Sequence, residues 1–169
     1  MKYFYILFFL FSFESFAQNS NETTCNCCDE NHSQFDFWKG NWEVTNASGK
    51  LLGINTIDKI QDNCVLRENW KSANGKITGT SYNFYNAQAK QWEQIWVDNS
   101  GGNLHLKGER IGNQMILKTD VETNRDGKPF YHKVTWTLNE DGTVRQLWET
   151  ITNDTEITVA FDGIYKKVD

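Results

Sequence analysis

Apolar residues in helical spacing are almost absent from this chain. No window of helical length in the body of the sequence repeats the i, i+3, i+4, i+7 pattern that marks an amphipathic helix. Proline occurs once in 169 residues, whereas aromatic residues make up 14% of the chain. Because aromatic and β-branched residues favour strands, this composition predicts an all-β fold.

Long hydrophobic stretches are also missing, with one exception at the N-terminus. An apolar run over residues 3–13 follows Lys2, and Ser15-Phe16-Ala17 supplies small residues of the kind that a signal peptidase reads. The run is too short to span a bilayer. We therefore predict a signal peptide over residues 1–17, cleavage after Ala17, and a periplasmic or secreted protein with no integral membrane segment.

The chain has no excess of positive charge. Lysine and arginine number 17 against 22 acidic residues, which gives a formal net charge of −5. Loss of the signal peptide removes one cation (Lys2) and one anion (Glu14), so the net charge does not change. Such a chain offers no basic patch to nucleic acid or anionic lipid. It also lacks a Ser-His-Asp order, a glycine-rich phosphate loop and a His-x-x-x-His zinc pair, and we expect no cofactor.

Turn-forming residues recur at short intervals after residue 34. They leave about ten strands of ordinary length, and ten antiparallel strands in one domain imply closure, because an open sheet would leave exposed edges. We predict an antiparallel up-and-down β-barrel over residues 34–169, preceded by a cysteine-containing arm at 18–33. The close spacing of Phe35, Phe37 and Trp38 predicts a short helical turn that plugs one barrel mouth.

The segment Trp92–Asp98 suggests what the barrel contains. Side chains alternate along a strand, so Trp92, Gln94, Trp96 and Asp98 share one face. A polar residue two positions before a tryptophan recurs at Glu68/Trp70 and at Gln146/Trp148. Buried amides and acids require partners or water, so this repetition predicts a polar cavity rather than a dry core.

Charged residues identify the outer face of the remaining strands. The same parity places Ser81 and Asn83 inside, and puts His132 on one face with Val134 and Trp136. Near the C-terminus it predicts the inward set Ile157, Val159 and Phe161. The predicted ligand-binding residues are Glu68, Trp70, Ser81, Asn83, Gln94, Trp96, His132, Gln146 and Trp148.

Five motifs in order resemble a bacterial family of secreted, lipocalin-like (calycin-type) β-barrel proteins that is known as a domain of unknown function. The likeness runs from about Cys28 to Tyr165 and implies a barrel with a central cavity. It brings no established activity and no catalytic residues. The motifs are Phe35-Asp36-Phe37-Trp38-x-Gly40-x-Trp42, Cys64-x-Leu66-x-Glu68-x-Trp70, Gly79-x-Ser81-x-Asn83-x-Tyr85, Trp92-x-Gln94-x-Trp96-x-Asp98 and Val144-x-Gln146-x-Trp148-Glu149.

Four cysteines in an exported protein predict two disulfides, with three pairings available. We expect Cys28 to pair with Cys64, which would fasten the arm to the barrel. That choice leaves Cys25 and Cys27, whose direct bridge would close a strained ring. An intermolecular bond, or a copper or zinc site that adds His32, is the alternative, although we expect no metal.

These observations favour a binding protein that encloses a small, partly apolar molecule. The first alternative is an enzyme, an isomerase, cyclase or hydrolase, that uses Glu68 as general acid or base, against the simpler reading of Glu68 as a structural acid. His132 is a further candidate base or haem ligand, and a lone histidine is more often a core or rim residue. The second alternative is a structural or interaction module with an outer apolar stripe of Tyr82, Phe84, Ile95 and Val97.

Overall fold

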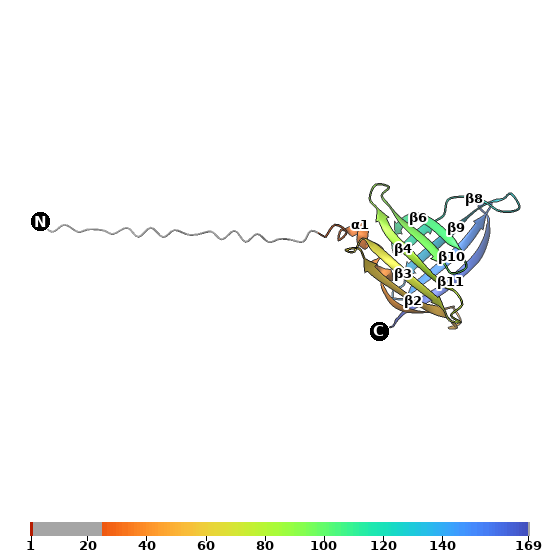
Figure 1. Ribbon diagram of the computed structural model, residues 1–169, viewed down its shortest axis with the longest axis horizontal. Helices are drawn as coiled ribbons and strands as arrows, with labels where there is room; N and C mark the ends of the chain where they lie inside the picture. Colours follow the sequence, from red (N-terminus) through yellow and green to blue (C-terminus); the bar gives the residue numbers. More distant parts are fainter. Residues whose placement is uncertain (2–24, 169) are drawn as a thin grey trace.

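A computed structural model describes residue 1 and residues 25–168, and the remainder of the predicted signal peptide lies outside the described residues. The fold is a closed antiparallel β-barrel of ten strands with one additional strand (Figure 1). Each strand of the ring pairs with the next in sequence, and the last pairs with the first. The ring consists of β1 (Gly40–Thr45), β2 (Leu51–Ile60), β3 (Val65–Ser72), β4 (Thr78–Asn86), β5 (Gln91–Asp98), β6 (Asn103–Ile111), β7 (Gln114–Lys118), β9 (Pro129–Leu138), β10 (Val144–Thr152) and β11 (Glu156–Val168).

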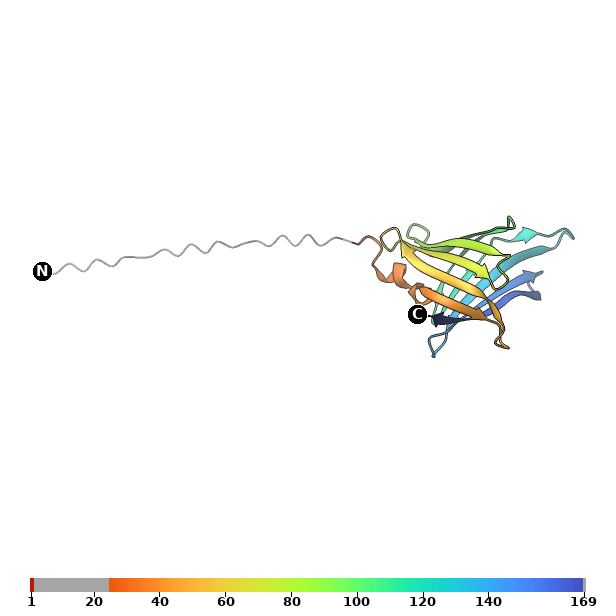
Figure 2. The same ribbon diagram turned by 60° about the horizontal axis from the view of Figure 1, so that its bottom comes forward.

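The additional strand, β8 (Glu122–Thr123), pairs only with the start of β9 and lies at the end of the barrel opposite the N-terminal helices (Figure 2). Asn and Asp side chains shape the turns as the sequence predicts. Asn46 and Asn124 each accept hydrogen bonds through Oδ1 from backbone N–H groups two and four residues later. No helix in the described part of the chain is long and apolar enough to cross a membrane.

The predicted plug is present at one end of the barrel. A short α-helix, α1 (Glu30–Ser33), leads into a 3₁₀ turn, η1 (Asp36–Trp38). Phe35 and Trp38 are fully buried, stack on each other at 5.0 Å and meet Trp136 edge-on or tilted at 5.2 and 5.3 Å. The indole N–H of Trp42 donates to the carbonyl of Trp38 at 2.9 Å. Aromatic packing therefore makes this half of the barrel a dry core.

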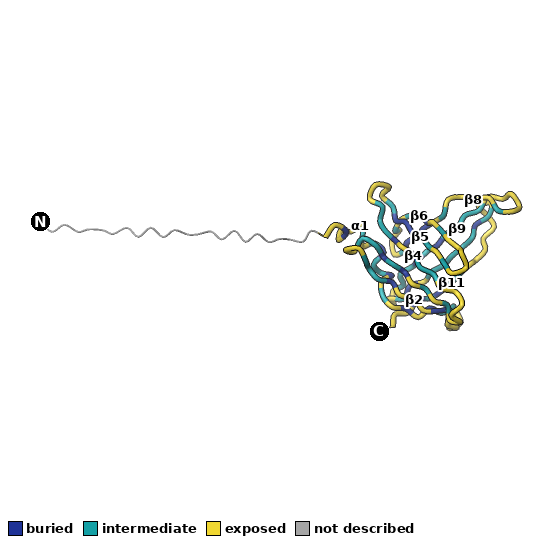
Figure 3. Tube along the Cα trace, in the orientation of Figure 1, coloured by how far each residue is buried: buried dark blue, intermediate teal, exposed yellow. Residues whose placement is uncertain are grey.

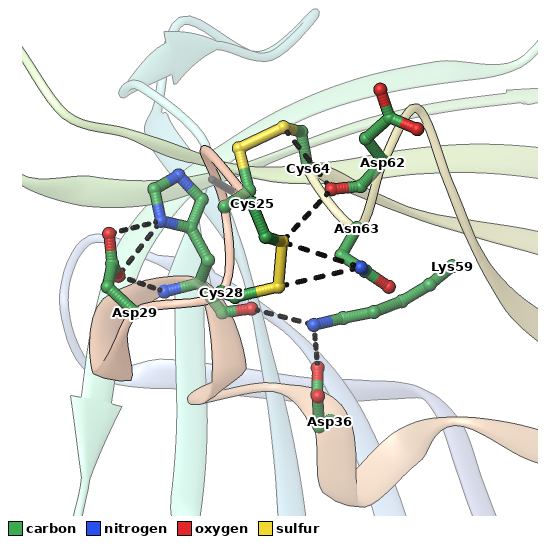
Figure 4. Close-up of a disulfide and its surroundings, with 10 residues drawn as sticks. Cys25, Cys28, Asp29, Asp36, Lys59, Asp62, Asn63 and Cys64 are labelled. Carbon is green, nitrogen blue, oxygen red and sulfur yellow. Dashed lines mark hydrogen bonds and ion pairs between the residues drawn. A yellow bond between two sulfur atoms is a disulfide. The ribbon is translucent and has the colours of Figure 1, made fainter. Parts of the chain in front are cut away.

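The cysteine pairing differs from our prediction. Cys27, not Cys28, is bonded to Cys64, and Cys28 is bonded to Cys25 (Figure 4). The chain turns at Asn26 and Cys27, which brings Cys25 and Cys28, the two ends of the turn, together. Cys27, the third residue of the turn, is left to bond with Cys64 of the barrel. A Cys-x-x-Cys ring accommodates that turn, whereas the Cys-x-Cys bridge implied by our prediction would be smaller and more strained.

All four cysteines are paired in disulfides. No free cysteine is present among the described residues, so the arm supplies no thiolate to copper or zinc. His32 instead contacts the Asp29 carboxylate at 2.9 Å, and Asp29 caps α1 by accepting from the His32 backbone N–H. Lys59 of β2 contacts both N-terminal elements: its ammonium group donates to the carbonyl of His32 in the arm at 3.2 Å and pairs with Asp36 of η1 at 2.8 Å (Figure 4).

The predicted inward positions of Ile157 and Val159 are wrong. The register of β10 against β11 shifts between Trp148, which pairs with Phe161, and Glu149, which pairs with Val159. The bulged residue, Ala160, reverses the alternation, because one extra residue moves every preceding side chain to the other face. Ile157 and Val159 are consequently 60% and 56% exposed.

We expect loss of the Cys27–Cys64 bridge to destabilise the fold strongly. Closure of a loop of this length, 37 residues of sequence separation, contributes about 4 kcal/mol by the chain-entropy relation. Cys27→Ser combined with Cys64→Ser should therefore lower the melting temperature by roughly 10 °C. Thermal denaturation monitored by circular dichroism measures this change.

The matched control is Cys25→Ser combined with Cys28→Ser, which opens only a four-residue turn. The same relation gives this short loop about 2 kcal/mol, so the melting temperature should fall by about half as much. Equal destabilisation of the two double variants would contradict the assigned pairing. Partial reduction with stepwise alkylation and tandem mass spectrometry then reads the linkage itself, since no protease cleaves between adjacent cysteines.

Candidate functional site

A cavity of about 280 Å³ occupies the half of the barrel away from the plug. Aromatic side chains of Trp70, Trp96, Trp148 and Phe161 form most of its wall. Its polar lining is Glu68, Gln94, Gln146 and Tyr165, with Ser72 and Asp98 nearer the turns. Figure 3 shows that buried positions alternate with less buried ones along the strands and that the connecting turns are exposed.

Glu68 lies at the centre of a hydrogen-bond network. Its side chain is 4% exposed, and both carboxylate oxygens have a donor: Asn55 Nδ2 lies 2.7 Å from Oε1, and Ser81 Oγ lies 2.6 Å from Oε2. Strand register explains the second contact, because Glu68 and Ser81 are directly opposite on β3 and β4. The sequence prediction of an inward acid here agrees with the structure.

The network continues from Ser81 toward β5. Asn83 donates through Nδ2 to Ser81 Oγ at 2.9 Å and to the carbonyl of Leu66 at 3.0 Å. Gln94, directly opposite Asn83, donates through Nε2 to Asn83 Oδ1 at 2.7 Å. Because Ser81 Oγ accepts from Asn83, its own proton is free to point at Glu68. The hydrogen bonds from Gln94 through Asn83 and Ser81 therefore end at the carboxylate.

On the other side the network reaches β11 and β10. Asn55 Nδ2 lies 3.4 Å from the Tyr165 hydroxyl, which in turn donates to Gln146 Oε1. Neither Asn55 nor Tyr165 belongs to the binding set predicted from sequence. Asn55 is 1% exposed on β2, and alternation of Gly53, Asn55 and Ile57 was the only local signal that marks it as inward.

Burial is the main determinant of the charge state of Glu68. Desolvation raises the pKa of its carboxyl from 4.5 to about 7, against the opposing effect of the hydrogen bonds from Ser81 and Asn55. Burial, together with the nearby Glu68 carboxylate, also raises the pKa of the Tyr165 hydroxyl well above its ordinary value, so that Tyr165 is neutral. Glu68 thus changes charge close to neutral pH.

Glycines on the inner surface fix the positions of the aromatic rings. A Cβ on Gly79 would lie 2.2 Å from Cζ2 of Trp96, one on Gly53 2.6 Å from Cη2 of Trp70, and one on Gly163 2.6 Å from Phe161. Each ring therefore lies directly over a glycine, in space that any other residue would fill. This arrangement holds the rings against the wall and keeps the space between them open.

His132 lies directly opposite Thr150 of β10, on the same face of β9 as Val134, which lines the cavity. Its Nδ1 accepts from the indole N–H of Trp148 at 3.0 Å and lies 3.1 Å from the Thr150 hydroxyl. Partial burial lowers the pKa of His132 below its ordinary value, so the ring is neutral at physiological pH. The histidine positions Trp148 and does not line the cavity.

The structure thus separates the predicted binding set into two groups. Six residues line the cavity: Glu68, Trp70, Gln94, Trp96, Gln146 and Trp148. The other three, Ser81, Asn83 and His132, do not line it but form hydrogen bonds with residues that do. Asp98 lines the cavity and also caps its turn by accepting from the backbone N–H groups of Ser100 and Gly102. On the outer face, Tyr82, Ile95 and Val97 are exposed as predicted.

No protein-family model matches the chain, and a search of curated proteins returned no match. The resemblance carried by the five motifs accordingly stays a prediction, and the site is interpreted from its own chemistry.

Glu68 should make the stability of the fold depend on pH. Its pKa is higher in the folded state than in the unfolded chain, so its stabilising contribution is present below pH 4.5 and is lost as pH rises through about 7. The free energy of unfolding should fall by about 3 kcal/mol between pH 5 and pH 8 on this account. In Glu68→Gln this fall should be absent.

Urea denaturation of both proteins at several pH values measures the effect. The difference between the two proteins isolates Glu68, because every other titratable group is common to both. Parallel pH profiles for the two proteins would show that Glu68 titrates at an ordinary pKa.

Proposed function

We propose that the protein binds a small, partly apolar organic molecule inside the barrel. The supporting observation is the cavity itself, about 280 Å³ in volume and walled by three indole rings and Phe161 around a polar floor. Ligand sites are typically apolar concavities with a few placed polar groups. The volume, near the lower end of their usual range, favours a small ligand.

The amide side chains support a ligand that also makes hydrogen bonds. Gln94 engages the network through Nε2 and Gln146 through Oε1. The other half of each carboxamide is left to the cavity, so the site presents one acceptor oxygen and one donor N–H₂ group. A molecule with a hydroxyl, amide or amine group on an apolar body matches this pair.

The place of action that we propose is the periplasm or the extracellular space. The two disulfides are typical of an oxidising compartment. The signal peptide predicted for residues 1–17 agrees with export. Membership of the lipocalin-like family of unknown function would fit the same picture, since such barrels enclose ligands.

Catalysis by Glu68 is the second candidate function, and one observation favours it. A pKa of about 7 suits a group that accepts and returns a proton at neutral pH. Both of its oxygens are already hydrogen-bonded, however, so a substrate would have to displace Asn55 or Ser81. Metabolite profiles of a deletion strain complemented with wild type or Glu68→Gln test this function: only a catalytic acid predicts an accumulated precursor that the variant fails to clear.

Filling the cavity should abolish binding without disturbing the fold. Ala160 lines the cavity and is exposed, so Ala160→Trp places an indole in the cavity at little cost to packing. We expect the wild type to bind the neutral dye N-phenyl-1-naphthylamine with a saturable rise in dye fluorescence, and Ala160→Trp to show none.

Val159→Trp is the matched control, because the neighbouring side chain lies on the outer face and should leave dye binding unchanged. Failure of the wild type to bind, or equal binding by Ala160→Trp, would refute a cavity-bound ligand.

A further inference from the structure

The charged groups of the cavity are all of one sign. Fourteen residues in the described part of the chain line it; two of them, Glu68 and Asp98, are acids, and none is lysine, arginine or histidine. Glu68 lies at the floor, and Asp98 lies where β5 ends. An anionic ligand would meet repulsion at both positions, with no basic group to offset it.

The aromatic wall is suited to positive charge. Trp70, Trp96 and Trp148 come from β3, β5 and β10, and Phe161 meets Trp70 edge-on at 5.8 Å. The indole N–H of Trp148 is already used by His132, so this ring offers the cavity its π surface rather than a donor. Tryptophan faces attract ammonium groups more strongly than other aromatic side chains do.

The surroundings of Glu68 contain no cation to neutralise it. The groups that face it are Asn55 on β2, Ser81 on β4 and the neutral Tyr165 on β11, and Gln94 and Asn83 complete the network without charge. His132, which accepts the indole N–H of Trp148, is not among the lining residues, and burial lowers its pKa and so favours its neutral form. Above neutral pH the cavity floor thus carries an uncompensated negative charge.

Resting on the binding function above, we propose that the ligand is an organic cation: a primary or secondary amine carried on an apolar, ring-sized body. The ammonium group lies toward Glu68, where Gln94 Oε1 can accept one of its hydrogen bonds. The apolar body lies between the indole rings, toward the turns. An amine supplies the countercharge that the protein itself does not place there.

Three probes of similar size and different charge test this assignment: 2-phenylethylamine, 2-phenylethanol and phenylacetate. Titration of tryptophan fluorescence, confirmed by calorimetry at pH 8, should show the amine binding at least about tenfold more tightly than the alcohol, and no measurable binding of the acid. The affinity for the amine should fall as pH decreases from 8 to 5.5, because Glu68 becomes neutral over this range.

Glu68→Gln should remove both the preference for the amine and its pH dependence, while the affinity for the alcohol persists. Asp98→Asn, which retains an oxygen for the turn, should reduce amine affinity by less, because Asp98 is half-buried at the end of β5, where solvent screens its charge. Ala160→Trp should abolish binding of every probe that the wild type binds.

Equal affinity for the amine and the alcohol, lost in Ala160→Trp, would overturn the cationic ligand and leave the binding function standing. Tighter binding of phenylacetate would overturn it in the same way. Absence of binding by all three probes and by the dye would refute both proposals.

Discussion

The pairing of the first strand with the last determines whether the interior exists at all. Five residue pairs between β1 and β11, from Asn41 with Val168 to Thr45 with Ile164, close the ring. Because β1 ends at Thr45, it pairs only with residues 164–168 of β11. The earlier residues of β11 form hydrogen-bonded pairs only with β10. Closure is thus complete at the plugged end and partial at the other, and the cavity lies at the partly closed end.

The interior divides into two regions with different energetics. Around Phe35, Trp38 and Trp136 the barrel is filled by interlocking aromatic rings, and burial of apolar surface stabilises it. Around Glu68 the same barrel buries an acid, whose desolvation opposes folding and is offset only in part by Asn55 and Ser81. A group retained at such a cost is more readily explained by function than by stability.

Sequence reasoning succeeded where one strand determines its own faces. The pairs Glu68/Trp70, Gln94/Trp96 and Gln146/Trp148 follow from alternation alone, and all line the cavity. Sequence reasoning failed where a β-bulge, or a partner distant in sequence, determines which way a side chain points or what it contacts. The bulge at Ala160 reverses parity without a local signal, and three cysteines within four residues do not reveal which one reaches Cys64. Asn55 and Tyr165 meet across 110 residues of sequence, so no spacing relates them.

The glycines beneath the aromatic rings restrict how this barrel can evolve. A side chain gained at Gly79 alone pushes Trp96 toward the cavity, whereas loss of Trp96 alone uncovers the backbone of Gly79 and leaves a void. Gly53 is restricted differently, because an added Cβ would also lie 2.4 Å from the backbone carbonyl oxygen of Lys71, so loss of Trp70 would not make room for it. A change in cavity shape at Gly79 and Trp96 therefore requires two coordinated substitutions on adjacent strands. In homologous chains, Gly79 and Trp96 should be inherited or replaced together, as one unit of ligand selectivity.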